Sequence, residues 1–383
     1  MHQKNHISYL DTIRGLAALT VISEHYVIAY GLPCETALCQ QVLDFSPLHI
    51  WWDGTAAVSM FFVLSGLVLS IKYFRISHKP DMSQFHLSHF LIGRMFRIWL
   101  PYLLVLIISA GLFLQTFGND VLNTRLLATD WIVDMWHKYP LTYADMLREG
   151  FLLDMPALIV LLPQSWTLSI ELVLSLLLPI GLLLADRGTV WLVFFSVLAI
   201  SLLNVSLFLL HFLMGLMIAR YYSPISHYLA DKLWQRRLML LAGLLFYTSG
   251  NYLPKAYFGD SAIWLLTGLG AGMILMFILG SKSTQSGLAH PFLRQIGKVS
   301  YSAYLSHMAI LICLTPYILK ATEALTDNRF VMWFAGWLIT IIVVQCISLL
   351  FYHWLEIPSM TIGRRIADLL ADSAANYVKE WTK

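Results

Sequence analysis

The sequence predicts an all-helical membrane protein, with about ten transmembrane helices around a central polar cavity and both termini in the cytoplasm. Of its 383 residues, 58% are hydrophobic and only 12% are charged, whereas roughly a quarter are charged in ordinary soluble domains. A helix needs about 20 apolar residues to cross the hydrocarbon layer. Stretches without any charged residue recur along the chain, among them 102–117, 172–185, 190–210 and 330–351.

The apolar stretches predict ten spans, at 10–30, 53–72, 98–117, 166–185, 189–204, 206–222, 238–253, 261–280, 299–319 and 331–353. An even number of spans places both termini on one side. Nineteen of the 25 basic residues then lie on that side, and six lie opposite, namely Arg125, Lys138, Arg148, Lys255, Lys320 and Arg329. Cytoplasmic loops carry the excess of Lys and Arg, so the termini are predicted to be cytoplasmic. The net charge of +3 thus reflects topology, not nucleic-acid binding.

The domain organisation is predicted to be simple, with a transmembrane domain at 1–358 and a cytoplasmic tail at 359–383. The longest outer loops, 31–52 and 118–150, contain several tryptophans, which suit the headgroup region. Residues 151–164 are apolar but broken by Pro156 and Pro163 and too short to cross. We expect a re-entrant or interfacial segment there.

The four cysteines do not form a metal-ligand pattern, and no metal is expected. Cys34 and Cys39 lie in the first outer loop, where an oxidising compartment permits a local disulfide. The sequence leaves that disulfide open. Cys313 and Cys346 lie in spans and are interpreted as packing residues.

The first span carries two polar residues on one helical face. His25 follows Arg14 by eleven positions, which is close to three turns and places the two about 16 Å apart along the axis. Asp11, three positions before Arg14, is near enough to pair with it. Ionisable groups in a span are costly unless they are paired or line a cavity. The structural alternative is a snorkelling arginine and a histidine that bonds a neighbouring helix.

The fourth span opens with Trp166 and Ser169 and contains Glu171 among leucines. A buried carboxylate needs a partner. His25 is one candidate, because both residues are predicted in the outer half of the bilayer, and a carboxylate would orient the imidazole. The alternative is a carboxylate held by a serine or a tryptophan.

Two further groups lie near the cytoplasmic boundary. Arg94 and Arg97 share a helical face, which suits a phosphate ligand and equally suits lipid headgroups. The ninth span begins with polar residues that either line a polar path or join neighbouring helices, namely Lys298, Ser300, Tyr301, Tyr304 and His307.

Taken in order, these motifs resemble the acyltransferase 3 family of bacterial membrane O-acyltransferases. The resemblance runs from residue 9 to about residue 358, nearly the whole chain. It departs from the family at Thr167, where serine is frequent, and at Ile357, where a basic residue is usual. It rests on YLDTIRGLAA at 9–18 with ten residues between Arg14 and His25, SMFFVLSG at 59–66, Arg94-x-x-Arg97 with Pro101, WTLSIE at 166–171, SYSAYLSH at 300–307 and Glu356-Ile-Pro358.

The resemblance implies transfer of an acyl group, usually acetyl, from cytoplasmic acyl-CoA to a hydroxyl of a glycan or glycolipid outside. It implies a bacterial inner membrane protein that acts in polysaccharide or lipopolysaccharide O-acetylation, with acyl-CoA as a substrate and no permanently bound cofactor. The chain looks like the bare ten-helix core, without the esterase-like domain of some members. A homo-oligomer stays open, and no nucleic acid is expected as a partner.

The resemblance also implies roles for residues. His25 is expected to act as general base, or to carry the acyl group transiently, with Glu171 orienting it and Arg14 essential. The CoA phosphates are expected near Arg14, Arg94 and Arg97, with Lys298, Ser300, Tyr301 and Tyr304 completing the donor site. Asp11, Trp166, Ser169 and His307 are expected to support these groups.

Two other classes of protein compete with this interpretation. A transporter would also place charges in the membrane, but it would show broken helices and usually an internal repeat, and no repeat is visible in the sequence. A scaffold subunit of a polysaccharide assembly complex would carry vestigial chemistry. The acceptor, the acyl chain and the oligomeric state are not readable from the sequence.

Overall fold

The computed structural model describes residues 7–34, 36–74, 77–83, 85–116, 128–136, 140–152 and 161–381, the last of these with side chains to 371. Every regular element in these ranges is helical. In chain order they are α1 (Ser8–Tyr30), α2 (Ala37–Phe45), η1 (Pro47–Trp51), α3 (Gly54–Ser70), η2 (Ile71–Tyr73), α4 (Leu87–Thr116), α5 (Asp130–Asp134), α6 (Tyr143–Gly150), α7 (Ser165–Arg187), α8 (Thr189–Leu203), α9 (Phe208–Arg220), α10 (Tyr222–Ala230), α11 (Leu233–Tyr247), α12 (Ser249–Tyr252), α13 (Lys255–Leu279), α14 (Lys282–Leu288), α15 (Pro291–Lys298), α16 (Ser300–Cys313), α17 (Thr315–Glu323), α18 (Arg329–Phe351), η3 (Tyr352–Glu356) and α19 (Ile357–Trp381).

Several of these helices are long and apolar enough to cross a membrane. Five qualify singly in the described part of the chain, and up to seven qualify if α9 with α10 and α16 with α17 are each one span. These two pairs bend by 70° and 53°. Helices α8 and α11 have 15 residues each, fewer than a straight crossing needs. The chain is thus a multi-pass helical membrane protein, and the count of ten spans stays a prediction.

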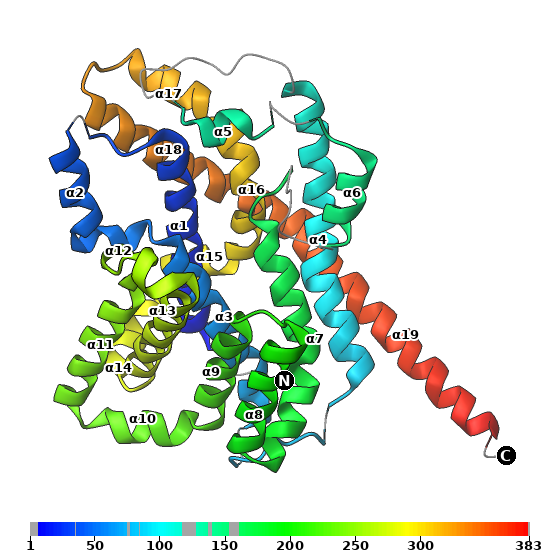
Figure 1. The fold of residues 1–383 in the computed structure, drawn as a ribbon. Helices are drawn as coiled ribbons and strands as arrows, with labels where there is room; N and C mark the ends of the chain where they lie inside the picture. The colour runs from blue at the N-terminus through cyan, green and yellow to red at the C-terminus, as the bar shows by residue number, and fades with distance from the viewer. Residues whose placement is uncertain are drawn as a thin grey trace.

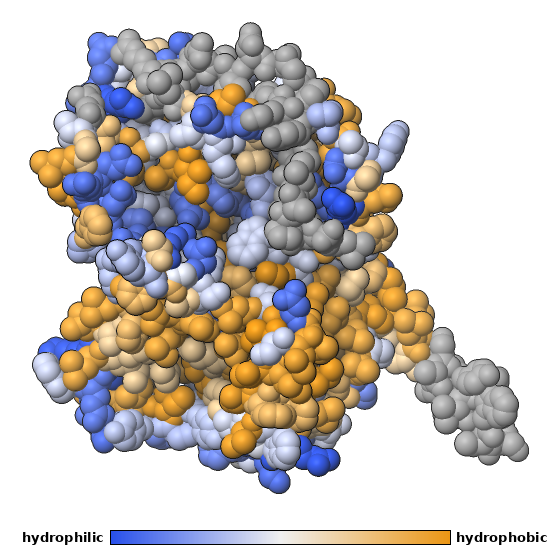
Figure 2. All heavy atoms as spheres, in the orientation of Figure 1, coloured by the Kyte–Doolittle hydropathy of each residue, from blue (hydrophilic) through white to orange (hydrophobic). Residues whose placement is uncertain are grey.

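Helix α1 lies at the centre of the bundle, in contact with α3, α15 and α16 (Figure 1). Its polar residues therefore face other helices. Apolar side chains form a broad band across the lower half of the face in Figure 2, over α7, α8 and α9. Hydrophilic side chains border this band at α10 below it, as expected at a membrane boundary.

Glycines permit two close helix crossings next to the cavities described below. A Cβ on Gly15 of α1 would lie 2.7 Å from the Cα of Gly297 of α15, and one on Gly297 would lie 2.3 Å from the Asp11 carbonyl oxygen. A Cβ on Gly66 of α3 or on Gly215 of α9 would likewise meet the backbone of the partner helix. Small residues at crossings let membrane helices approach this closely. They bring the C-terminal end of α15 onto the N-terminal half of α1.

The last predicted span continues into a further helix without a break. A π-helical turn, η3, joins α18 to α19, and α19 packs along α4. The His89 Nε2 of α4 lies 3.0 Å from Asp368 Oδ1 of α19. The predicted tail at 359–383 thus begins within a helix that leans on the bundle before it extends away from it (Figure 1).

The outer connections are partly helical. The structure joins Cys34 and Cys39 in a disulfide, which resolves the question that the sequence left open. Of the expected re-entrant segment, residues 153–160, including Pro156, lie outside the described residues. Its end is held by Glu149, whose buried carboxylate accepts hydrogen bonds from the backbone N–H groups of Leu161 and Leu162.

Candidate functional site

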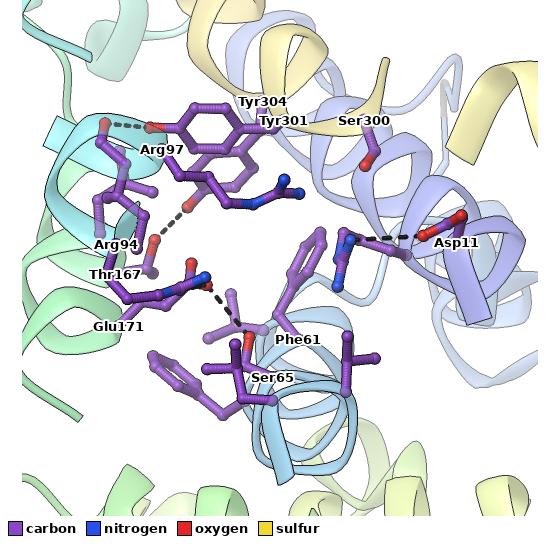
Figure 3. Close-up of a pocket in the computed structure, with 17 residues that line it drawn as sticks. Asp11, Phe61, Ser65, Arg94, Arg97, Thr167, Glu171, Ser300, Tyr301 and Tyr304 are labelled. Atoms are coloured by element: carbon purple, nitrogen blue, oxygen red, sulfur yellow. Dashed lines mark hydrogen bonds and ion pairs between the residues drawn. The ribbon is translucent and has the colours of Figure 1, made fainter. Parts of the chain in front are cut away.

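A cavity of about 310 Å³ opens beside the N-terminal end of α1. Helices α1, α3, α4, α7 and α16 supply its walls, and Figure 3 shows its polar residues converging from these five directions. Its lining combines the predicted polar residues with an apolar floor: Asp11, Arg14, Val58, Phe61, Phe62, Ser65, Val68, Leu69, Arg94, Arg97, Ile98, Thr167, Leu168, Glu171, Ser300, Tyr301 and Tyr304.

Two arginines of this cavity differ in how they are paired. The Arg14 Nη1 lies 3.7 Å from Asp11 Oδ1, so the pair expected from their spacing is present. Arg97 reaches into the cavity (Figure 3), and among the described residues no carboxylate lies within ion-pair distance of it. Its Nη1 instead contacts the Met360 sulfur at 3.3 Å. Arg97 therefore presents to the cavity a positive charge that forms no direct ion pair with any described carboxylate.

Arg94 and Glu171 form the second charged pair of the cavity. The Arg94 Nη2 lies 3.3 Å from Glu171 Oε1 and donates to the Ser175 hydroxyl at 2.9 Å. The Ser65 hydroxyl donates to the same carboxylate oxygen at 3.2 Å. Arg94 is only 8% exposed, so it faces the cavity and not lipid headgroups.

These contacts correct one expectation, because Glu171 does not pair with His25. The reason is that Glu171 and His25 lie at different depths in the helix bundle. Helix α7 begins beside Gln164, whose amide donates to the carbonyl oxygens of Tyr304 and Leu305 in the interior. Glu171 is almost two turns further along α7, beside the inner end of α1. The prediction had placed the start of this helix nearer the outer surface.

A second cavity, of about 490 Å³, adjoins the first and shares Asp11, Arg14, Arg97, Ser300 and Tyr301 with it. It adds two basic residues, Arg294 and Lys298, and one carboxylate, Glu356. The two cavities together contain five cationic side chains and three carboxylates, namely Arg14, Arg94, Arg97, Arg294 and Lys298 against Asp11, Glu171 and Glu356. This surplus of positive charge suits an anionic ligand.

Tyr304 closes the far end of the first cavity. Its hydroxyl lies 2.6 Å from the Thr167 hydroxyl and 3.1 Å from the Gln164 carbonyl oxygen. Its ring lies 5.7 Å from the ring of His307, centroid to centroid. Tyr304 thus connects the arginine-lined cavity to the histidine one turn further along α16.

His307 is the partner of His25. The His25 Nδ1 lies 2.8 Å from His307 Nε2, and the His307 Nδ1 lies 2.8 Å from the Tyr304 carbonyl oxygen. The planes of the two rings lie within 11° of each other, with 5.0 Å between their centroids. On the other side His25 stacks on Trp131 of α5 at 5.7 Å. The structure therefore places His25 between an aromatic ring and a second imidazole.

This chain of hydrogen bonds determines where the protons lie. A carbonyl oxygen only accepts, so His307 carries its proton on Nδ1. A buried imidazole that contacts no carboxylate is neutral, so the His307 Nε2 has a lone pair and accepts from the His25 Nδ1. A neutral His25 protonated on Nδ1 then has a free lone pair on Nε2. That nitrogen is the atom that can remove a proton from a substrate.

The other predicted residues take different places. Lys298 and Ser300 line the second cavity. Trp166 packs against Phe208 and Trp264, at centroid distances of 5.8 and 6.3 Å, and the Ser169 hydroxyl donates to the Leu152 carbonyl oxygen. These last two residues hold helices together and do not line either cavity.

Three charged or hydroxyl-bearing lining residues show how sequence reasoning left parts of the site unassigned. Ser65 and Glu356 belonged to recognised motifs without a stated role, and the structure shows each facing a charged cavity. Arg294 had a usable signal, because it precedes Lys298 by four positions and so shares its helical face. The pairing of His25 with His307 had no such signal, since 282 positions separate them.

Comparison with known proteins agrees with the geometry. No curated protein and no solved structure matches the chain significantly. The model of the acyltransferase 3 family, described as an acyltransferase domain, matches residues 7–353, nearly the whole chain. All of the polar groups just described lie within that match except Glu356 and the Met360 contact. The chain belongs to the acyltransferase 3 family and is a multi-pass membrane acyltransferase.

Proposed function

We propose that the protein transfers an acyl group, most simply acetyl, from acyl-CoA to a hydroxyl of a cell-surface polysaccharide or glycolipid, with His25 as general base. The observation that carries this proposal is the junction at Tyr304. There a cation-rich cavity meets a histidine pair whose hydrogen bonds leave one imidazole nitrogen free.

The donor side follows from charge and shape. CoA carries several phosphate charges on its nucleotide end and a slender pantetheine arm. Arginine forks suit phosphate oxygens, and Arg97, Arg294 and Lys298 have no carboxylate within ion-pair distance in the described part of the chain. The nucleotide would occupy the larger cavity, and the arm would follow the apolar floor past Phe61 toward Tyr304.

The acyl transfer would proceed at His25. Its Nε2 removes the proton from the acceptor hydroxyl while the oxygen attacks the thioester carbonyl. A C–O bond forms, the C–S bond breaks, and the proton passes from His25 to the departing thiolate of CoA. His307 holds the Nδ1–H of His25 and so keeps Nε2 as the basic nitrogen. Such a base contributes about 10²- to 10⁴-fold to a rate.

The proposed location is the bacterial inner membrane, with the arginines toward the cytoplasm and the acceptor outside. The excess of basic residues on one side supports this orientation. The Cys34–Cys39 disulfide after the outer end of α1 supports it independently, because disulfides persist in oxidising compartments.

The experiment uses purified protein in nanodiscs with labelled acetyl-CoA and a panel of surface glycans. We expect release of CoA together with label on the glycan. We expect His25→Ala to lose at least about 10²-fold in rate, and Arg14→Ala to lose activity through weaker donor binding. If both variants retain full acyl transfer, the site assignment is wrong.

The bends between α9 and α10 and between α16 and α17 are a feature that transporters also have. A transporter moves its substrate without releasing CoA. If the wild-type protein transfers no label to any glycan but carries a glycan across a vesicle membrane, the transporter interpretation replaces this one.

A further inference from the structure

A third cavity, of about 270 Å³, lies at the opposite end of α1 from the arginines. It is formed by the end of α1, the segment from α2 to the start of α3, and the segment around α12 and α13. Its lining combines four carboxylates with aromatic rings: Glu24, Val27, Ile28, Asp44, His49, Trp52, Asp53, Thr55, Gly250, Asn251, Lys255, Asp260, Ile263 and Trp264.

Several polar atoms in this cavity are buried without a partner. Asp53 is only 5% exposed. Its Oδ1 accepts from the backbone N–H of Ala56 and so caps α3, whereas its Oδ2 has no hydrogen-bond partner. The Trp52 Nε1 and the His49 Nδ1 are also buried and unpartnered. Because buried polar groups are normally satisfied, these three point to a polar ligand.

Glu24 is held at the edge of the same cavity by close contact with α3. A Cβ on Gly54 would lie 1.6 Å from Glu24 Oε2, so the glycine makes room for the carboxylate against the first turn of α3. This arrangement directs Glu24 into the lining beside Asp53.

We propose that this cavity binds the acceptor as an uncharged or amine-bearing sugar unit. The proposal deepens, and rests on, the acyl-transfer function proposed above. Carboxylate oxygens accept hydrogen bonds from sugar hydroxyls, and the His49 Nδ1 can accept from or donate to a hydroxyl. Trp52 and Trp264 offer flat apolar faces with polar edges. Within the described residues no three His, Cys, Asp or Glu side chains converge to hold a metal ion.

The charges of the cavity select among sugars. Four carboxylates face one lysine, and Lys255 is already paired with Asp260 at 3.3 Å. A uronic or other acidic sugar would add like charge to this set, and juxtaposed like charges reject a partner. An amine-bearing sugar would instead meet complementary charge.

The cavity is also placed to serve His25. Ile28, in its lining, is three positions from His25 and four from Glu24, so it lies on the helical face between them. The cavity therefore lies at the same end of α1 as His25, away from the arginines of the first two cavities.

The test measures sugar binding without donor. Full-length protein in nanodiscs is titrated with glucosamine tetramer, maltotetraose and tetragalacturonate by calorimetry. We expect the first two to bind and tetragalacturonate to bind at least about tenfold more weakly. If none of the three binds, or if tetragalacturonate binds as well as the others, the proposal is overturned.

Two variants test the site itself. Asn caps helices as well as Asp, so Asp53→Asn keeps the cap on α3 but replaces the free oxygen. It should weaken glucosamine-tetramer binding about tenfold. Gly54→Ala should displace the flexible Glu24 carboxylate and weaken binding too, with the melting temperature unchanged. Unchanged binding in both variants would overturn the proposal.

Two controls keep this test separate from the proposed function. Asp231→Asn makes the same charge change in the turn between α10 and α11 and should leave sugar binding unaltered. Acetyl-CoA binding is measured on the same samples. If the wild-type protein binds the sugar but does not bind acetyl-CoA, the result counts against the proposed donor site and not against this cavity.

Discussion

At the scale of single residues, the central feature is the histidine pair that determines the protonation of His25. The Tyr304 carbonyl oxygen determines which nitrogen of His307 carries the proton, and His307 does the same for His25. Among the described residues no carboxylate contacts either ring, which differs from the familiar arrangement in which an acid holds the histidine. A neutral orienting group suits a buried site, because it adds no charge that must be desolvated.

His307 is therefore expected to be a positioning residue. His307→Leu cannot accept the proton of His25 Nδ1, so the basic nitrogen is no longer fixed. We expect kcat to fall about 10²-fold or more, with KM for acetyl-CoA unchanged because the arginine cavity is untouched. His307→Gln places an amide oxygen near the same point and should recover much of the rate. Full kcat in His307→Leu would contradict this role.

Arg97 tests the donor side at the same scale. Its charge has no carboxylate partner in the described structure, so a phosphate would be its main ion-pair partner. Arg97→Ala should weaken CoA binding at least about tenfold by calorimetry. Pantetheine lacks the nucleotide phosphates and should bind both proteins equally.

Arg237→Ala removes an exposed arginine from α11, outside both cavities, and serves as the matched control. Equal losses of CoA affinity in the two variants would mean that Arg97 contributes only general charge. If Arg97→Ala loses as much affinity for pantetheine as it loses for CoA, the variant distorts the cavity.

At the scale of the elements, the crossing of α1 and α15 determines how the second cavity is built. Gly15 and Gly297 meet backbone to backbone, and Arg294 and Lys298 lie on the same short helix as Gly297. The basic residues of α15 thus line the same cavity as Arg14 only because these glycines allow α1 and α15 to touch. The Thr12 hydroxyl donates to the Leu288 carbonyl oxygen at 2.7 Å and so joins α1 to the end of α14, just before α15 begins.

Gly297→Ala is expected to separate the two helices. The added methyl would collide with the Asp11 carbonyl, and overpacking costs about 1–3 kcal/mol. We expect a lower melting temperature and weaker CoA binding together. Gly287→Ala is the control, since a Cβ there would meet nothing within 4 Å and helix propensity favours alanine. If the Gly297→Ala protein is as stable as the Gly287→Ala protein, α1 and α15 do not cross as closely as described.

The elements also show what the sequence could predict. Apolar stretches located the helices, and residue spacing correctly paired Asp11 with Arg14 and grouped Arg94 with Arg97. Helical periodicity reports the face on which a residue lies, but not its depth. For that reason Glu171 was expected beside His25, whereas α7 begins in the interior and carries Glu171 to Arg94. The His25–His307 contact depends on how α1 and α16 pack, which no local pattern encodes.

At the scale of the whole molecule, one helix connects the two proposed substrate sites. Arg14 lies in the cationic cavities, and Glu24, one position before His25, lies in the acidic cavity toward the other end of α1. The charges of the cavities are opposite, which suits an anionic donor at one end and an uncharged or cationic acceptor at the other. This arrangement supports the proposed transfer across the membrane without passage of either substrate.

The most direct test of this account is acyl transfer between separated compartments. Protein is reconstituted in sealed vesicles, and its orientation is determined with an impermeant thiol label on Asp231→Cys in a Cys346→Ser background. Labelled acetyl-CoA is supplied on the side of Asp231, and glucosamine tetramer is sealed on the other side. The account predicts acetylated sugar in the opposite compartment, reduced at least about 10²-fold in His25→Ala. Acetylation only when donor and acceptor share one side, or undiminished transfer in His25→Ala, would contradict it.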